Sequence, residues 1–346
     1  MDDAQESLLS LMHTKGFSVK YMEERKKEEL RRFLLFLHVD KGMSLNDVAT
    51  LVGNKTSGYT SWLYRQLGIR CRPFEEARLK GIREKRRKYE RKPFDGMDED
   101  KAYLMGLRHG DLSVSKPWRG VVRVSTSTTH PAMANLFRSL FEPYGHVYQH
   151  PRYKKDMMTY EWNLSTILDE TFDFLLPKWN EIKKWVLSDS RLVVAYLSGF
   201  LDAEGSITIA RSVDGHVQLM TYYNNSDLAL LKWVQSMIES LGFKTCLCLN
   251  KKKGTRTKKY GIVMRRDYWQ LSINGRVNVQ TFLRVLHVRH REKEQRISIA
   301  LSVVKGEPYA AVSDAFRNLV QLIKAEVKEF IVRAESEYLS SHQLQV

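Results

Sequence analysis

Apolar residues recur at helical spacing through the first 95 residues. Residues 18–39 place them three or four positions apart with charges between them, which predicts an amphipathic helix. Within 41–69, Ser44 is a candidate N-cap ahead of a short apolar run, and Gly53 is placed to end that helix. A second helix is expected near 57–66, after a short polar turn, with Trp62 and Leu63 on its apolar face.

The pair of helices within 41–69 resembles a helix-turn-helix unit. In that interpretation the second helix enters the major groove of DNA. The side chains that could face bases or phosphates are Ser57, Tyr59, Thr60, Ser61 and Arg65. An ordinary helical hairpin inside a bundle accounts for the same pattern.

Residues 70–92 hold eleven Lys and Arg against four Glu. We interpret them as a helix or linker that lies along phosphates, or as a solvated spacer with no contact. Pro93 and Gly96 follow in a segment where the charge changes sign, so we place a domain boundary near residue 95.

From residue 100 onward the hydrophobic pattern occurs twice. Each copy is predicted to contain a helix, strands, a helix, strands and a further helix. The two central helices, 131–145 and 228–242, match without gaps and both end in Gly. The predicted fold class is α+β, with two αββαββα repeats after an N-terminal helical domain. The expected domains are 1–95, 96–188, 189–305 and a C-terminal helix at 306–346.

The helix that opens each copy has small residues on one face. Gly106 and Gly110 lie four apart in the first, and Gly199 and Ala203 take the equivalent places in the second. Gly inside a helix costs roughly 1 kcal/mol relative to Ala, a cost that close packing of two backbones would offset. Parallel packing of the two helices would bring together the acids that follow, Asp111 and Glu204.

Charge changes the interpretation of this scaffold. The chain has 56 Lys and Arg against 40 Asp and Glu, a net charge of +16. Such an excess favours a polyanionic partner, most often nucleic acid, over a merely basic soluble protein.

Targeting and cysteine patterns add little. No apolar run spans a membrane and no signal-peptide pattern occurs, so we expect a soluble intracellular protein, cytoplasmic if the host is a prokaryote. Cys246 and Cys248 alternate on one predicted strand, and we expect buried or half-buried thiols there in place of a zinc site.

Two carboxylates forced together repel each other, and a divalent cation removes that conflict. Mg²⁺ prefers such oxygen ligands and keeps waters for substrate phosphates. Metal ions beside a phosphodiester activate water and stabilise the leaving oxygen. The spacing of Asp111 and Glu204 therefore permits a metal-dependent nuclease.

The paired stretches resemble the motif of the LAGLIDADG homing endonucleases. They read LMGLRHGDL (104–112) and LSGFLDAEG (197–205), and the resemblance extends over roughly residues 100–305. Two motifs in one chain resemble the monomeric members, so we expect a monomer. The resemblance implies two saddle-shaped sheets along the major groove and hydrolysis of both strands of a long DNA target. It also implies that Asp111 and Glu204 hold Mg²⁺ or Mn²⁺, with two or three ions shared with DNA phosphates.

The first motif departs from the family pattern at two positions. His109 replaces the usual acid, and Leu112 replaces the final Gly. The acid at the metal position, Asp111, is kept. Because Gly lets a chain leave a helix freely, Leu112 could shift the exit and the Asp111 carboxylate with it.

Candidate DNA-binding residues follow from basic loops and alternating strands. Residues 250–266 hold eight Lys and Arg and no acid in a hairpin-like segment, which suits phosphate contact. The family resemblance also implies basic residues around the metals; Lys154, Lys155, Lys253 and Lys259 are candidates, of which we expect Lys155 and Lys253 to be catalytic. The full set of predicted DNA contacts is Arg65, Arg123, Ser125, Lys154, Lys155, Gln218, Lys251, Lys252, Lys253, Arg256, Lys258, Lys259, Arg265 and Arg266.

Three functions stay open on the sequence. The first is a site-specific, metal-dependent double-strand DNA endonuclease. The second is a DNA-binding regulator on the same scaffold that has lost cleavage, which the altered first motif favours. The third is an intron-RNA maturase, with intron RNA as the partner in place of duplex DNA.

Overall fold

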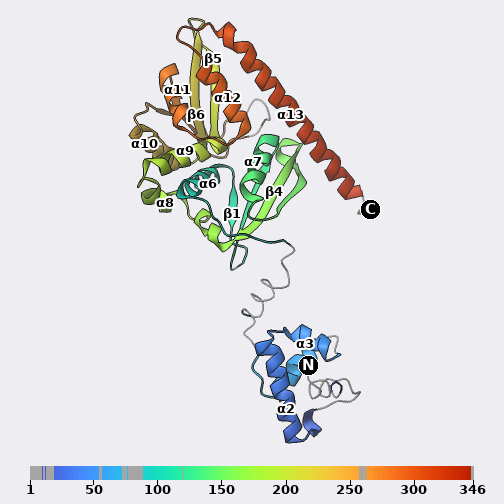
Figure 1. Ribbon diagram of the computed structural model, residues 1–346. Helices are drawn as coiled ribbons and strands as arrows, with labels where there is room; N and C mark the ends of the chain where they lie inside the picture. Colours follow the sequence, from blue (N-terminus) through green and yellow to red (C-terminus); the bar gives the residue numbers. More distant parts are fainter. Residues whose placement is uncertain are drawn as a thin grey trace. The chain divides into compact units, whose positions relative to one another are not determined.

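A computed structural model of the chain describes residues 10, 12, 19–53, 57–71, 76, 89–118, 120–256, 261 and 263–343. The chain divides into two compact units, residues 1–88 and 89–346. Figure 1 gives the helices and strands of both.

The N-terminal unit is helical, as its periodicity predicts. Its elements are η1 (Val19–Tyr21), α2 (Glu24–Leu35), a π-helical turn η2 (Phe36–Asp40), α3 (Leu45–Leu51) and α4 (Ser57–Gln66). Ser44 caps α3 in a capping box with Asp47, and the predicted second helix has its observed bounds at 57–66. Leu30, Leu34 and Leu63 are fully buried in a core of its own.

Two side chains of α4 differ from expectation. Thr60 is fully buried, so it does not offer its hydroxyl to DNA. Trp62, expected on the apolar face, is 40% exposed. Since Leu63 and Tyr64 fill the core beside α2 and α3, the helix turns Trp62 outward along with Arg65.

The first repeat starts with α6 (Asp98–Gly110) and β1 (Ser113–Ser115). It continues with β2 (Val121–Thr128), α7 (Pro131–Phe141), β3 (Val147–Lys154), η3 (Lys155–Met157) and β4 (Thr159–Asp169), and ends with η4 (Glu170–Leu175) and α8 (Trp179–Val186). The incoming segment packs on this repeat, because Lys92 donates its backbone N–H to Tyr144 and Phe94 contacts Phe172.

The second repeat has the same order of elements. They are α9 (Ser190–Glu204), β5 (Gly205–Arg211), β6 (Val217–Asn225), α10 (Leu228–Ser240), β7 (Cys246–Lys251), β8 (Tyr268–Asn274), α11 (Arg276–Val285) and α12 (Arg291–Ser302). The last helix of each repeat, expected as one long segment, is two short pieces: η4 with α8, and α11 with α12.

Two four-stranded antiparallel sheets have matching strand orders, β1-β2-β4-β3 and β5-β6-β8-β7. The predicted α+β fold with two repeats and an N-terminal helical region is confirmed. Each sheet buries one face against helices, so successive residues on every strand alternate between the core and the opposite face.

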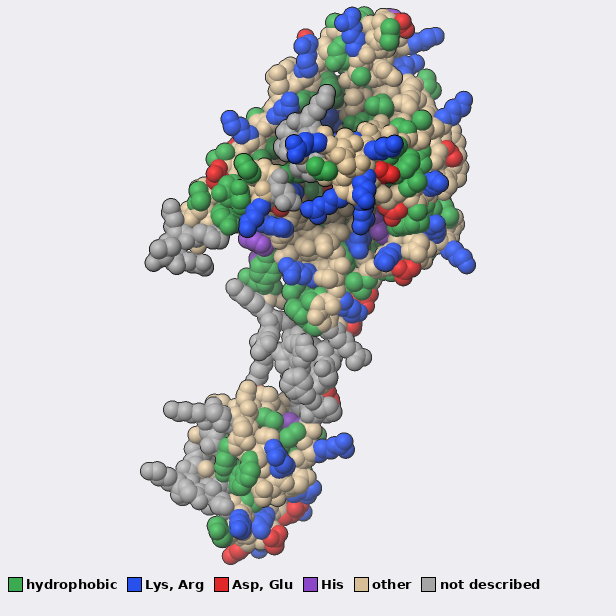
Figure 2. All heavy atoms as spheres, turned by 180° about the vertical axis from the view of Figure 1, so that it is seen from behind, with side chains coloured by type: hydrophobic (Ala, Val, Ile, Leu, Met, Phe, Trp, Pro, Cys, Tyr) green, Lys and Arg blue, Asp and Glu red, His purple; other side chains and the backbone are tan. Residues whose placement is uncertain are grey.

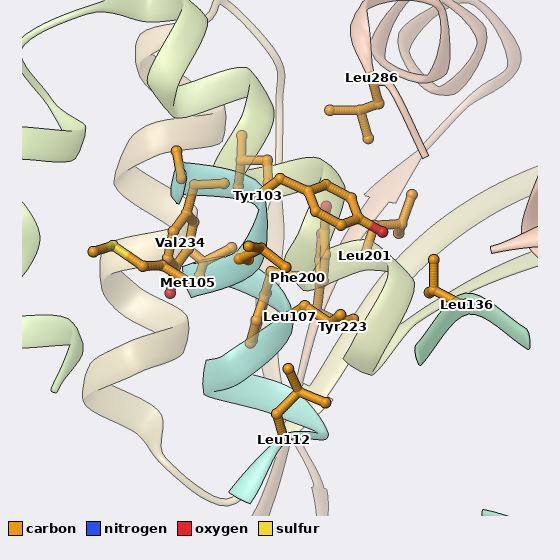
Figure 3. Packing of buried hydrophobic residues seen from close by; sticks show 14 of the residues in the cluster. Tyr103, Met105, Leu107, Leu112, Leu136, Phe200, Leu201, Tyr223, Val234 and Leu286 are labelled. Atoms are coloured by element: carbon orange, nitrogen blue, oxygen red, sulfur yellow. The ribbon is translucent and has the colours of Figure 1, made fainter. Parts of the chain in front are cut away.

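Helices α6 and α9 lie side by side between the sheets (Figure 1). A β-carbon added to Gly106 would lie 2.1 Å from the Tyr196 carbonyl oxygen, and one added to Gly199 would lie 2.0 Å from that of Tyr103. The predicted backbone-to-backbone packing is therefore present. Figure 3 shows Leu107 and Phe200, one from each helix, in the shared core, where Phe200 stacks on Tyr223 of β6.

A long C-terminal helix, α13 (Tyr309–Gln343), runs across both repeats (Figure 1). It contacts β3, β4 and α7 of the first repeat and β5 and α12 of the second. Trp162 of β4 donates its indole N–H to the Phe330 carbonyl oxygen at 2.9 Å, and the two rings pack together.

Cys246 and Cys248 are free and exposed, so the expectation of buried or half-buried thiols is wrong. Both point away from the core because their strand, β7, is the edge of its sheet and their alternating positions fall on the face opposite α10 and α11. Among the described residues, no helix combines the length and apolar character that crossing a membrane requires.

Candidate active site and nucleic-acid interface

The two motif acids lie at the same end of the α6–α9 pair. Asp111 is the C-cap of α6, and Glu204 is the last residue of α9. A β-carbon on Gly110 would lie 2.3 Å from that of Ala203 and 2.9 Å from Cγ of Glu204, so the helices are in close contact beside the acids. The small residues named from the sequence therefore set the position of both carboxylates.

The electrostatics show that the acids interact. Burial, followed by the charge of Asp111, raises the pKa of Glu204 to about 7. Burial also raises the pKa of Asp111, and the positive charges of Lys293 and His130 oppose that increase. The repulsion expected between two neighbouring carboxylates is thus present.

The chain continues differently after the two helices that carry the acids. Helix α9 passes directly into β5 at Gly205, where a β-carbon would lie 2.1 Å from the Leu201 side chain and 2.7 Å from its carbonyl oxygen. Helix α6 ends at Gly110, and Asp111 and Leu112 connect it to β1, which begins at Ser113. Leu112, buried in the core, therefore fits because the first helix exits earlier than the second.

Neutral polar groups surround the acids. Asn225, at the end of β6, donates its side-chain N–H to Oε1 of Glu204 at 3.0 Å. Thr126 of β2 donates its hydroxyl to the backbone carbonyl of Asp111 at 3.1 Å. Burial, with the charges of Glu204 and Asp111, raises the pKa of Tyr268.

Lys293, in the first turn of α12, is a site residue that the sequence did not reveal. Its Nζ donates to the carbonyl oxygens of Leu201 and Asp202, at 2.5 and 2.6 Å, at the C-terminal end of α9. Burial lowers its pKa to about 8, and the charges of Asp202, Asp111 and Glu204 act in the opposite direction. In the sequence it is one cation among several in a charged helix, so no local signal distinguishes it.

His109, which stands where the family pattern has an acid, has a specific partner. In the second motif, Asp202 accepts the Tyr103 hydroxyl at 2.6 Å and the backbone N–H of Arg289 at 2.6 Å. At the equivalent place, His109 Nδ1 lies 2.9 Å from the Tyr196 hydroxyl. Burial lowers the pKa of His109 to about 4, so a neutral histidine replaces the acid while the tyrosine contact is kept.

The donor chemistry fits a hard divalent cation. Two interacting carboxylates, one with its pKa raised to about 7, gain from a shared positive charge. Among the described residues, no group of three or more His, Cys, Asp and Glu side chains could hold a metal ion. A bound Mg²⁺ or Mn²⁺ would therefore depend on water and DNA phosphates for its other ligands, as Mg²⁺ commonly does.

The first sheet has a polar face opposite its helices. The strand registers place Arg123 and Ser125 of β2 on this face with Asn163 and Ser165 of β4. Lys154, at the end of β3, is on the same face and pairs with Glu161 at 3.3 Å. The predicted contacts Arg123, Ser125 and Lys154 are thus brought together on one surface.

The second sheet has the matching face. Gln218, Met220 and Tyr222 of β6 alternate with buried residues. Asn250 donates its side-chain N–H toward Asn224 and Gln270 on this face. Cys246 and Cys248 also lie here, since they pair with Ser272 and Gln270.

The basic hairpin follows β7. Arg256 pairs with Val263 in an isolated bridge, and Lys253 donates its backbone N–H to Asp267. The exposed cations of this segment are Lys251, Lys252, Lys253, Arg256, Arg265 and Arg266, while Lys258 and Lys259 lie outside the described residues. Figure 2 shows Lys and Arg side chains around a hollowed part of one face of the larger unit.

A cleft of about 250 Å³ opens beside Asp111. His130, Lys154, Met157 and Glu161 line it with the acid. Lys155, on η3, and Lys253, on the hairpin, are exposed, and their assignment as catalytic residues stays a prediction. Lys293 is a stronger candidate for that role, because its charge acts on both acids.

Comparisons with known proteins support part of this interpretation. Residues 191–287 match the model of a LAGLIDADG-like domain. No curated protein sequence matches the chain.

Solved structures similar to this chain include mesophilic variants of the homing endonuclease I-DmoI, at 20% identity over 55% of this chain and 95% of that one, with a TM-score of 0.36. Full-length DUF199/WhiA from Thermatoga maritima is 16% identical over 66% of this chain and 69% of that one, with a TM-score of 0.39. A mutant of I-SmaMI is 11% identical over 66% of this chain and 98% of that one, with a TM-score of 0.36.

Proposed function

We propose that this chain, which carries a LAGLIDADG-like domain, is a site-specific, metal-dependent double-strand DNA endonuclease of the homing type. The observation that carries the proposal is the juxtaposition of Asp111 and Glu204, one from each repeat, at the end of a helix pair between two polar sheet faces. A paired acid site on a pseudosymmetric scaffold suits a substrate with two antiparallel strands.

The chemistry assigns roles to this chain's residues. Asp111 and Glu204 would hold two or three Mg²⁺ or Mn²⁺ ions together with DNA phosphates, and bound metal would supply an activated water and stabilise the leaving oxygen. Asn225 fixes the Glu204 carboxylate by a hydrogen bond. Lys293, anchored on the last carbonyls of α9, places a positive charge at the acids, where negative charge develops on the phosphate.

The basic charge of the chain and the alternation of side chains along the strands support DNA binding. The polar faces of the two sheets supply side chains for base edges, and the basic hairpin at 250–266 supplies phosphate contacts. In the N-terminal unit, α4 contacts α3 and exposes Arg65, as the second helix of a helix-turn-helix unit would. We propose that this unit adds contacts to a long DNA target.

The test begins with a target selected from random duplex DNA, followed by cleavage with Mg²⁺ and, separately, Ca²⁺. Asp111→Asn and Glu204→Gln should each abolish cutting while keeping affinity within about threefold. Asp214→Asn, at an exposed acid in the β5–β6 loop, is the matched control and should cut like wild type. Undiminished cutting by both active-site variants would remove the metal assignment.

A second function is a DNA-binding regulator that has lost cleavage. The neutral His109 in place of an acid and the early exit of α6 at Gly110 favour it. In the same assay, tight sequence-specific binding without cuts under Mg²⁺ or Mn²⁺ would support this function and exclude the endonuclease.

A further inference from the structure

A hydrogen-bonded histidine and glutamate join the two repeats beside the candidate active site. His130 is the N-cap of α7 in the first repeat, and its side chain is 46% exposed. Glu292 is in the first turn of α12 in the second repeat, and its side chain is only 9% exposed. Nδ1 of His130 lies 2.9 Å from Oε1 of Glu292.

This contact orients the imidazole ring. An ionised carboxylate only accepts hydrogen bonds, so Nδ1 of His130 carries a hydrogen and donates a hydrogen bond to Glu292. The backbone is fixed as well, because the His130 N–H donates to the Thr128 hydroxyl at 3.0 Å. The other ring nitrogen, Nε2, is thus left for a further partner.

Glu292 is held as a carboxylate. Burial alone would raise its pKa, but the hydrogen bond and charge of His130, with the charges of His290 and Arg296, lower it below its usual value. An imidazole that lies between this carboxylate and a bound phosphate would donate a ring N–H to each.

The position of that imidazole is significant. His130 lines the cleft beside Asp111, together with Lys154 and Glu161. Its charge acts on Asp111, whereas the partner found for Glu204 is the neutral amide of Asn225. The two acids thus have different surroundings.

Among the described residues, the second repeat has no equivalent pair. Asp227 is the N-cap of α10 and matches His130 in the aligned repeats, and its carboxylate accepts the indole N–H of Trp179 from α8 at 3.1 Å. The carboxylate only accepts hydrogen bonds and the indole N–H is already donated to it, so this pair offers no donor to a phosphate. The His130–Glu292 pair is therefore a feature of the Asp111 side of the molecule, not of the repeated scaffold.

We propose that His130 is a catalytic residue for one DNA strand: its Nε2 contacts an oxygen of the phosphate that binds in the cleft beside Asp111, and Glu292 is the residue that positions it. This inference rests on the proposed endonuclease function. Its consequence is that hydrolysis of the two strands depends on different side chains. A mutation can therefore slow cleavage of one strand and leave cleavage of the other unchanged.

The experiment uses the full chain and its selected target with a different dye on each strand, so that nicking of each is followed in one reaction. His130→Ala should slow cleavage of one strand by roughly 100-fold, as loss of a donor to a developing charge does, and leave the other within about threefold. Glu292→Gln should slow the same strand by a smaller factor. His130→Lys, which again offers N–H donors at this place, should recover part of the loss.

Controls separate a chemical role from a structural one. His287→Ala, at an exposed histidine between α11 and α12, should leave both strands unchanged. Equal slowing of both strands by His130→Ala, or a lowered Tm that accounts for the loss, would overturn the inference. So would wild-type rates on both strands while Asp111→Asn and Glu204→Gln stay inactive, and in that case the endonuclease function would stand. A wild-type protein that cuts neither strand would overturn both proposals.

Discussion

The carbonyl oxygen of Tyr196 lies 2.1 Å from where a β-carbon on Gly106 would be, so these two residues bring the backbones of α6 and α9 into direct contact. Gly199 and Tyr103 repeat the contact across the pair at 2.0 Å. No side chain fits between the helices at either place. Since Asp111 and Glu204 end these helices, the geometry of the site depends on this contact.

Gly106→Ala and Gly199→Ala should each destabilise the larger unit by about 3 kcal/mol or more, because the helices must separate to admit a methyl group. In an exposed helix the same substitution stabilises by roughly 1 kcal/mol, so the sign of the effect is diagnostic. Gly58→Ala, at an exposed glycine of α4, is the control. Urea unfolding measures all three, and a neutral Gly106→Ala would contradict the packing.

The helix pair could be predicted from sequence because its signal is local. A glycine four residues from another small residue, repeated in two stretches, places a small-residue face on each helix. The sheets also followed from alternation, and Arg123 and Ser125 lie on the polar face as expected. The exposed Cys246 and Cys248 were not predicted, because alternation shows that two residues share a face but not which face is buried.

The basic residues of the site could not be predicted in this way. Lys293 lies far along the chain from Asp111 and approaches it only because α12 packs against the end of α9. His130 reaches Glu292 across 162 positions of sequence. Such pairs depend on how the repeats dock, and a periodic pattern carries no information about docking.

Metal binding should stabilise the larger unit. At pH 8, above the pKa of about 7 for Glu204, both acids carry charge and repel each other. Saturating Mg²⁺ or Ca²⁺ should add about 2.7 kcal/mol at a hundredfold excess over Kd, seen as a rise in Tm. Asp111→Asn should lose most of that rise, and Asp214→Asn should keep it. An equal rise in both variants would place the ions elsewhere.

His290 should make the folded state sensitive to acid. It is buried, and its Nδ1 has no hydrogen-bond partner within the described part of the chain. Burial with the charge of Lys293 lowers its pKa to about 4, against the effect of Glu292. Between pH 6.5 and 4 the unfolded chain binds a proton that the folded one does not, so stability is present above pH 6.5 and is lost as pH falls, at about 1.4 kcal/mol per unit.

The variant His290→Gln isolates this contribution. Its backbone N–H, which donates to Asp202, is unchanged by the substitution. Relative to wild type, the variant should therefore be more stable at pH 5 than at pH 7.5, with a free energy of unfolding larger by about 1–2 kcal/mol. His287→Ala, an exposed site, should show no such difference between the two pH values. A parallel pH profile for His290→Gln would contradict the assignment.

Helix α13 should contribute stability through its buried face. Phe330 is 7% exposed and packs on Trp162, so Phe330→Ala should cost about 3 kcal/mol. Val332 on the same helix is 54% exposed, and Val332→Ala should stay within about 0.5 kcal/mol. Thermal unfolding of the two variants compares the faces directly, and equal effects would mean that α13 does not dock on β4 as observed.

Arg123 offers the clearest test of the sheet face. It is exposed on β2, opposite the core, with Ser115 and Ile167 as its neighbours across the strands. Arg123→Ala should weaken binding to the selected target by about 1–3 kcal/mol if its guanidinium reads a base. Arg317→Ala on α13 should have no effect, because that side chain pairs with Asp314 one turn earlier on the same helix.

The salt dependence of the Arg123 variant decides between a base and a phosphate contact. A lost phosphate contact reduces the slope of log K against log salt by about 1 and weakens all sequences alike. A lost base contact leaves the slope unchanged and relaxes specificity at one position of the target. Since Ser125 lies two positions from Arg123 on the same face and Ser165 lies opposite Ser125, neutral polar side chains neighbour Arg123, and we expect the second result. Unchanged affinity for target and random DNA alike would show that this face does not bind DNA.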